Sequence, residues 1–218
     1  MSKVINPWLN ISWNNRIADI DNVFLQGKGI NNIILDKTLP EPYTGSPSAA
    51  VYCLGMNPSE IDYAFESIEA NKQLLLQYTK KTLNHSLKDN MWYNLHNHEG
   101  YCWWKNVTSK LRKELKRDPC FFNIEFFPYH SKRGFHFPSK LPSYDYSDEL
   151  IKKAMKDEKF ILILRHKTQW LKRIDNLKNY PRLFYIDSKY ARNLVIDKEH
   201  ICKGDNCQSE IADLIAKF

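Results

Sequence analysis

The sequence lacks long hydrophobic runs. No stretch of about 18 consecutive apolar residues occurs in its 218 residues. Residues 1–8 have neither the apolar block nor the cleavage pattern of a secretory signal peptide. The basic residues are spread along the chain and do not line one amphipathic helix, so a membrane surface is not a favoured partner. We therefore expect a cytoplasmic protein with no membrane partner.

Motifs of several common enzyme classes are also missing. The chain has neither the Gly-x-Gly-x-x-Gly turn of dinucleotide-binding proteins nor the Gly-x-x-x-x-Gly-Lys-Ser/Thr loop that holds nucleoside triphosphates. It has no Gly-x-Ser-x-Gly elbow and no cysteine with an evident histidine partner, which disfavours a serine or cysteine hydrolase. We expect no cofactor.

Cysteine is scarce, and its five copies are an odd number without the paired spacing of zinc or iron–sulfur ligands. Reduced thiols and no metal site are expected. Cys53 and Cys120 sit in apolar, strand-like runs and are predicted to be small core residues. Cys202 and Cys207 flank a short polar loop, but two further ligands do not accompany them.

What the chain does contain predicts one compact domain. Its residues are 43% hydrophobic, and no Pro-, Gly- or Ser-rich stretch suggests a linker. We therefore expect a single domain over residues 1–218, with residues 1–40 wrapping the rest as a helical and extended segment. The net charge of +7 favours an anionic partner such as a nucleic acid.

Apolar runs and helical spacing alternate along the chain. Buried strands are predicted for residues 50–54, 120–126, 160–164 and 183–186. Helices are predicted for residues 59–83, where Ser59 is a candidate N-cap, and for 103–115, 147–155 and 168–177, with a shorter one near 13–25. This alternation predicts an α/β fold, a three-layer α/β/α sandwich with a central four-stranded parallel sheet.

The carboxyl ends of parallel strands open onto one rim, where α/β proteins place their chemistry. Residues 55–58, Gly-Met-Asn-Pro, follow the first predicted strand. The glycine allows the chain to turn sharply as it leaves the strand, and the proline ends the hydrogen-bonded pairing of the strand. The Asn57 amide can therefore point into a crevice and hold a water or a ligand. The same residues are also typical of a simple strand-ending turn that Asn57 caps.

Four segments resemble motifs of the uracil-DNA glycosylase superfamily, most closely of its mismatch-specific and single-strand-selective branches. Residues 53–59, Cys-Leu-Gly-Met-Asn-Pro-Ser, resemble a strand end that reads Gly-(Ile/Met)-Asn-Pro-Gly. Residues 98–104, His-Glu-Gly-Tyr-Cys-Trp-Trp, are similar to His-Pro-x-Asn-Arg-Phe-Trp. Residues 126–128 occupy the place of Asn-Leu-Cys-Pro, and residues 188–193 are similar to His-Pro-Ser-Pro-Arg-Asn. The likeness spans residues 39–193.

The resemblance implies a glycosylase that takes one nucleotide out of the stack into a rim pocket bordered by Gly55 and Met56. Asn57 would hold the water that attacks the sugar carbon. Ser188 lies where active relatives often have a histidine that stabilises the departing base, and its neutral hydroxyl is a weaker partner. The implied partner is DNA, either single-stranded or a damaged or mismatched duplex, and we expect a monomer.

Glu125 is the most consequential departure from this family. The family's asparagine at this position reads uracil through one donor and one acceptor, whereas an ionised carboxylate offers acceptors only. A carboxylate would repel the oxygens of uracil and favour a base edge that displays amino or imino hydrogens. Strict uracil specificity is therefore not expected. In the alternative interpretation, Glu125 pairs with Arg133 or Arg165 as structural support.

The remaining assignments concern stacking and DNA contacts. Phe126 would border the base, and His96 would stack on it, with Tyr93 and Trp92 as other candidates. Basic and aromatic residues suited to phosphates and unstacked bases are Tyr129, Lys132, Arg133, Lys189, Tyr190 and Arg192. Tyr190 would press into the gap left by the flipped nucleotide. Solvated basic loops explain these residues nearly as well.

Two other functions stay open at this stage. A catalytically inactive relative would bind single-stranded or modified DNA without releasing a base, because Glu125 and Ser188 replace the usual residues. In a third reading, the rim holds a small molecule in an unrelated α/β enzyme. A basic stripe beside the site would favour DNA, whereas a small-molecule site needs only one or two cations.

Overall fold

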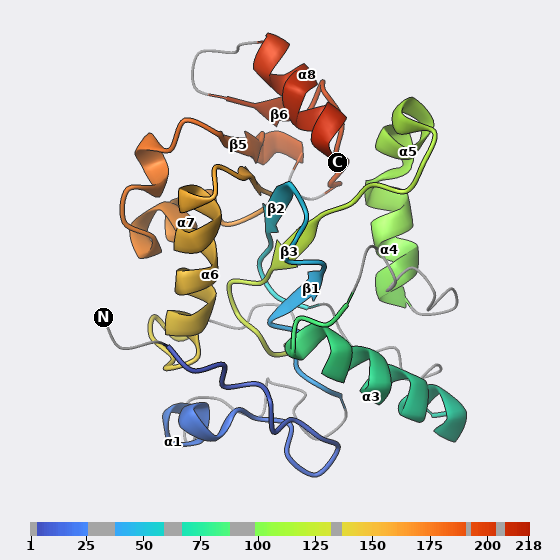
Figure 1. The fold of residues 1–218 in the computed structure, drawn as a ribbon, viewed down its shortest axis with the longest axis vertical. Coiled ribbons are helices and arrows are strands. Elements are labelled where there is room, and N and C mark those ends of the chain that lie inside the picture. The colour runs from blue at the N-terminus through green and yellow to red at the C-terminus, as the bar shows by residue number, and fades with distance from the viewer. Residues whose placement is uncertain are drawn as a thin grey trace.

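The computed structural model describes residues 4–25, 38–58, 67–87, 99–131, 137–190, 193–203 and 208–218. At its centre lies a six-stranded mixed sheet with the strand order β1-β3-β2-β4-β5-β6 (Figure 1). The strands are β1 (Tyr43–Gly45), β2 (Val51–Leu54), β3 (Phe122–Ile124), β4 (Phe160–Ile163), β5 (Leu183–Ile186) and β6 (Ile201–Cys202). β2 pairs in parallel with β3 and β4, and β4 with β5, while β1 and β6 are antiparallel at the two edges.

The sheet is larger than the four parallel strands expected from the sequence. The four predicted apolar runs contain β2 to β5, and the two edge strands were not predicted because runs of three and two residues carry no readable period. β1 depends on Gly45, whose φ is +90°. A Cβ there would lie 2.1 Å from the carbonyl oxygen of Phe121, so only glycine permits this close strand approach.

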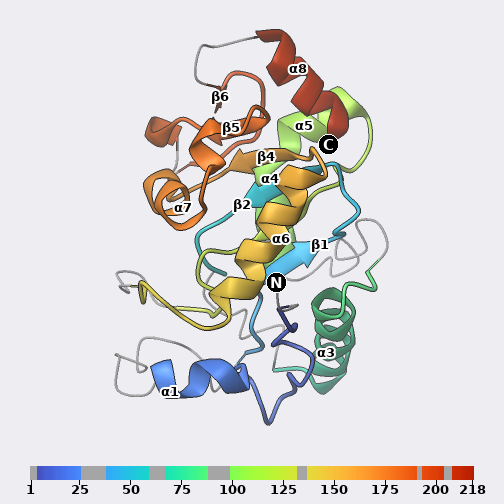
Figure 2. The ribbon, with the colours of Figure 1, turned by 60° about the vertical axis from the view of Figure 1, so that its left-hand side comes forward.

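Helices pack against the sheet on both sides. The α-helices are α1 (Asn22–Leu25), α3 (Glu69–Leu83), α4 (Glu99–Val107), α5 (Ser109–Leu115), α6 (Tyr144–Lys156), α7 (Lys167–Arg173) and α8 (Gln208–Lys217). Short 3-10 turns are η1 (Asp19–Asp21), η4 (Leu177–Asn179) and η5 (Ser188–Tyr190). In Figure 1, α6 and α7 lie on one side of the sheet and α4 and α5 on the other, and Figure 2 shows α6 crossing in front of the strands.

The core consists of two apolar clusters that the sheet separates. Along β2, Tyr52 and Leu54 join the cluster that contains buried residues of α3, α6 and α7. Val51 and Cys53 join the other cluster, with residues of α4, α5 and α8. This alternation follows from the two-residue period of a strand, and burial on both faces explains why β2 is apolar at every position.

The helix predicted over residues 103–115 is two helices in the structure. The break falls at Thr108, whose hydroxyl donates to the carbonyl oxygen of Trp104 at 2.7 Å. The carbonyl oxygen of Val107 accepts a hydrogen bond from the backbone N–H of Ile196 at 2.9 Å. Because this carbonyl bonds to a residue far along the chain, it does not accept a hydrogen bond within the helix. The spacing of apolar residues does not reveal such a long-range contact.

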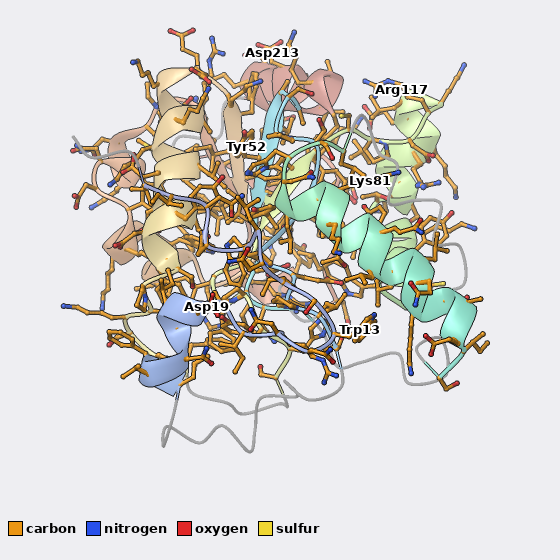
Figure 3. The ribbon with its side chains drawn as sticks, turned by 60° about the horizontal axis from the view of Figure 1, so that its bottom comes forward. Trp13, Asp19, Tyr52, Lys81, Arg117 and Asp213 are labelled. Carbon is orange, nitrogen blue, oxygen red and sulfur yellow. The ribbon has the colours of Figure 1, made fainter. Side chains whose placement is uncertain are left out.

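The amino-terminal segment packs on the same core as the sheet. Trp8, Ile11, Ala18 and Leu25 belong to the cluster under α6 and α7. Figure 3 shows this segment, marked by Trp13, at the opposite end of the molecule from α8. None of the helices in the described ranges is long and apolar enough to cross a membrane.

Candidate functional site

The strand order marks one place on the rim for a site. From β2 the chain adds β3 on one side and then returns to add β4 on the other, so the order reverses between β2 and β4. Open α/β sheets bind ligands outside the carboxyl ends of the strands at such a reversal. The segments that leave β2, β3 and β4 here begin at Gly55, Glu125 and Leu164.

Glu125 lies directly against Gly55. A Cβ at Gly55 would be 2.2 Å from Oε2 of Glu125 and 2.7 Å from its Cδ, so the carboxyl group occupies the space that a side chain would fill. The backbone N–H of Gly55 donates to the carbonyl oxygen of Ile124 at 2.8 Å, which extends the pairing of β2 with β3 by one residue. The two predicted site residues are therefore in contact.

Asn123 fixes the orientation of this carboxyl group. It precedes Glu125 by two residues and thus lies on the same face of the chain, and its Nδ2 donates to Oε1 at 2.7 Å. Oε2 of Glu125, Oδ1 of Asn123 and Nε of Arg165 are buried, and none has a hydrogen-bond partner within the described residues. We call Gly55, Asn123, Glu125 and Arg165 the carboxyl site.

The structure also bears on the interpretation of Glu125 as a structural ion-pair partner. Across the described ranges, no ion pair within 4.0 Å joins Glu125 to Arg165, although the guanidinium is close enough to influence the carboxyl electrostatically. Arg133, the other candidate partner, lies outside the described residues. Arg165 extends over the ring of Trp103 on α4, with its Cζ 5.7 Å from the ring centroid.

Burial raises the pKa of Glu125 to about 7. The hydrogen bond from Asn123 and the charge of Arg165 act in the opposite direction, while the charge of Glu41 adds to the rise. A carboxyl with this pKa is only partly ionised near neutral pH, whereas the sequence-based argument assumed a fully ionised carboxylate. The neutral carboxyl offers one O–H donor beside its acceptors, and Asn123 occupies Oε1, which leaves Oε2 to carry the proton.

This shift predicts how stability depends on pH. The pKa of Glu125 rises from an ordinary 4.5 to about 7 on folding, so ionisation opposes folding. The contribution of Glu125 to the free energy of unfolding is expected to be highest below the unfolded pKa, to fall as the pH rises through this window, and to level off above the folded pKa, with a total loss of roughly 3 kcal/mol.

Glu125→Gln keeps the shape and removes this titration. Urea unfolding followed by circular dichroism should show that the wild type loses stability relative to Glu125→Gln as the pH rises through the window. Equal slopes for the two proteins would contradict the assignment of the buried proton to Glu125.

Asn57 is fixed in one orientation. Its Nδ2 donates to the carbonyl oxygen of Pro58 at 2.7 Å and to Oγ of Ser131 at 3.0 Å. Both amide hydrogens are therefore engaged, and Oδ1 is the atom that can accept a hydrogen bond from a water. The contact with Ser131 joins the segment after β2 to the segment after β3, so Asn57 does more than cap its own turn.

Met56 joins the same two segments through its backbone, because its carbonyl oxygen accepts from the N–H of Phe127 at 2.8 Å. Two hydrogen bonds, one from a side chain and one from the backbone, thus cross between the rim segments.

Phe126 and Tyr129 are core residues, and the burial of Tyr129 corrects its assignment to DNA. Phe126 packs edge-on against Trp170 at 5.1 Å between ring centroids. Tyr129 is 1% exposed, and its hydroxyl donates to Oδ2 of Asp21 at 2.8 Å and accepts from the backbone N–H of Ala18 at 3.1 Å. The Tyr129 ring is not placed to reach a DNA backbone, and the assignment of Phe126 to the base stays a prediction.

The loop after β5 has no described contact with the carboxyl site. Ser188 and Lys189 are exposed, and Nζ of Lys189 lies 3.4 Å from Oδ2 of Asp187. The half-buried Tyr190 packs edge-on against His200 at 4.1 Å. Among the described contacts, none joins Ser188 to Asn57 or Glu125. The predictions for His96, Lys132, Arg133 and Arg192, and for Ser59 as an N-cap, fall outside the described residues.

Trp170 is a site residue that the sequence reasoning missed. It lies on α7, is fully buried, and donates from Nε1 to the carbonyl oxygen of Gly55 at 2.9 Å. The indole thereby fixes the backbone where the chain leaves β2. The sequence shows only a tryptophan at a helical core position, which does not indicate this hydrogen bond. Asn123, in contrast, is a polar residue inside an apolar strand, and this pattern could have marked it as a site residue.

A second polar cluster lies near β6. Asp197, Glu199 and His200 bring potential metal-ligand atoms within 4.8 Å of one another. Nζ of Lys110 is 2.9 Å from Oδ2 of Asp197 and 3.3 Å from Oε2 of Glu199, so one ammonium group pairs with both carboxylates. Burial acts to raise the pKa of Asp197, but hydrogen bonds from Lys110 and His200 outweigh it and hold that pKa below its ordinary value. The cluster stabilises the turn before β6.

Comparison with models of protein families, with curated proteins and with solved structures finds no match. Function is therefore inferred from the geometry and chemistry of the rim.

Proposed function

We propose that the protein binds DNA, takes one base out of the stack into the rim between β2 and β4, and hydrolyses its N-glycosidic bond with a water held by Asn57. The fold expected for this function is a three-layer α/β/α sandwich, and helices on both faces of the sheet agree with it. The resemblance of residues 53–59 to a glycosylase strand end points to the same reaction.

One observation carries this proposal. The Asn57 amide is held by Pro58 and Ser131, so its Oδ1 is pre-oriented as an acceptor at the point where the strand order reverses. Cleavage through an oxocarbenium-like transition state needs a well-positioned water more than a strong base, and a fixed acceptor supplies that position. The neighbouring carboxyl site would contact the base.

The exposed position of Ser188 favours a second candidate function. This residue makes no described contact with the carboxyl site, so charge stabilisation of a departing base is not evident there. A protein that binds an extruded base without hydrolysing the bond would have this arrangement. The two candidates share the DNA site and differ in turnover.

Base release from labelled oligonucleotides tests the proposal. The substrates are single strands and mismatched duplexes that carry uracil, hypoxanthine, xanthine or modified cytosines. Asn57→Ala is expected to lower the single-turnover rate by about 100-fold, because the water loses its position. DNA affinity, measured in parallel, should change little.

Asn6→Ala is the matched control, since Asn6 also donates from Nδ2 to a backbone carbonyl, that of Leu83 at 2.7 Å, and none of the described contacts joins it to Asn57 or Glu125. It should release the base at the wild-type rate. Salt-sensitive binding without release by the wild type would establish the second candidate, and the absence of both binding and release would refute a DNA function.

A further inference from the structure

The segment that follows β4 places two cations over aromatic rings. Cζ of Arg165 lies 5.7 Å from the ring centroid of Trp103 on α4. Nζ of Lys167 lies 3.1 Å from the ring centroid of Tyr185 on β5. Tyr185 pairs with Ile163, the last residue of β4, so this ring and the cations border the carboxyl end of that strand. We call Trp103, Arg165, Lys167 and Tyr185 the β4 rim surface.

Trp103 is 38% exposed, whereas the other tryptophans of the described ranges are buried or half-buried. The other large apolar side chains that the described part of the chain exposes lie in residues 4–24 and 68–74, so Trp103 is the one that contacts a rim segment. Arg165 and an edge-on contact with Trp104, at 4.7 Å between ring centroids, hold the indole in place. The rim thus presents a flat apolar surface with a fixed orientation.

The two cations form no ion pair in the described part of the chain. No acidic side chain there lies within 4.0 Å of Arg165 or Lys167, and Nε of Arg165 is buried without a hydrogen-bond partner among these residues. Arg182 differs, because it lies over the ring of Phe160 at the amino end of β4 and pairs with Glu158. Positive charge beside aromatic rings, with no bound carboxylate, favours an anionic ligand at the carboxyl end of β4.

A single strand of nucleic acid carries both groups that this surface can bind. Its unpaired bases stack on aromatic rings, and its phosphates accept contacts from lysine. In a duplex the neighbouring base pairs cover the faces of each base, so the indole would have no ring to stack on. A small anion would contact Lys167 but would leave Trp103 exposed to water.

We propose that the β4 rim surface binds single-stranded DNA, with an unpaired base stacked on Trp103 and a phosphate held by Lys167. This inference rests on the proposed function, which supplies DNA as the partner, and it names the form of the strand and the residues that hold it. Arg165 belongs to both the β4 rim surface and the carboxyl site. The bound strand therefore passes the rim where one nucleotide would be extruded.

Equilibrium binding of two fluorescent strands of equal length tests the stacking contact. One strand carries thymine at every position, and the other carries abasic sites, so that it keeps the phosphates and lacks the bases. Measured by anisotropy at constant ionic strength, Trp103→Ala is expected to weaken binding of the thymine strand about tenfold and that of the abasic strand by less than about twofold. Trp103→Phe keeps an aromatic ring and should weaken binding of the thymine strand by less than about threefold.

The salt dependence of binding tests the phosphate contact. Lys167→Gln should weaken binding of both strands and reduce the slope of log affinity against log salt concentration by about 0.7, the value for one phosphate contact with a single strand. Arg182→Gln is the matched control, because it also removes one positive charge from above an aromatic ring, at the amino end of β4. Its slope should equal that of the wild type.

An unchanged affinity of Trp103→Ala for the thymine strand, or an equal loss for both strands, would overturn the inference. So would binding of a duplex alone, and base release that depends on Asn57 would then leave the proposed function standing without it. Trp103-dependent binding of the thymine strand without base release from any substrate would support the inference together with the second candidate function. If neither single strands nor duplexes bind, the inference and the proposed function both fail.

Discussion

Trp170→Ala is expected to lower the free energy of unfolding by roughly 4–6 kcal/mol. The side chain is fully buried, contacts Phe126 edge-on and donates to the carbonyl oxygen of Gly55. Its removal leaves a large cavity and an unpaired buried carbonyl, and both effects act where the chain leaves β2. This loss is comparable to the whole stability of an ordinary domain, so the variant is expected to be largely unfolded at room temperature.

Trp170→Phe separates the two effects, because it keeps much of the ring volume and loses the N–H donor. Its expected loss is roughly 1–3 kcal/mol. Trp103→Ala is the matched control, since this tryptophan is 38% exposed on α4, and it should cost about 1 kcal/mol or less. Urea unfolding followed by circular dichroism gives all three values. Equal losses for Trp170→Ala and Trp103→Ala would show that the indole of Trp170 does not support the rim.

Gly55→Ala is expected to destabilise the protein by roughly 1–3 kcal/mol and to displace the Glu125 carboxyl. The new Cβ would lie 2.2 Å from Oε2, so the carboxyl has to turn away and its hydrogen bond from Asn123 is lost. The backbone itself does not require glycine here, because positive φ among the described glycines is found at Gly45.

A double-mutant cycle makes this prediction specific. In a Glu125→Ala background the obstacle is gone, and Gly55→Ala should be neutral or stabilising by roughly 0.5 kcal/mol through reduced freedom of the unfolded chain. The coupling between the two positions should therefore exceed about 1 kcal/mol. Additive effects would mean that Glu125 does not lie on Gly55 in solution.

Much of the fold was readable from the sequence because its central strands are apolar on both faces. The runs that contain β2, β4 and β5 were located to within one residue, since each is a continuous apolar stretch between polar turns. The two edge strands and the interruption at Thr108 were not readable. β1 depends on Gly45 beside Phe121 and the interruption depends on Val107 bonded to Ile196, and both contacts join residues far apart in sequence.

The sequence predicted several residues of the candidate site but less of their chemistry. Strand-end logic placed Gly55, Asn57 and Glu125 on one rim, and the structure brings Gly55 and Glu125 into contact. The same logic assigned Tyr129 to the surface, because an aromatic residue in a basic stretch is expected to be exposed. Its hydrogen bond to the distant Asp21 is not evident from the sequence. The protonation of Glu125 depends on burial, which a sequence does not display.

The antiparallel edge strands have a consequence for self-association. β1 and β6 are three and two residues long and flank the four parallel strands on either side. A sheet edge recruits another chain through its row of unpaired backbone groups, and short edge strands offer few of them. The parallel strands, which have three or four residues and are the more apolar ones, are each paired on both sides. The fold thereby shields its most aggregation-prone segments from strand addition.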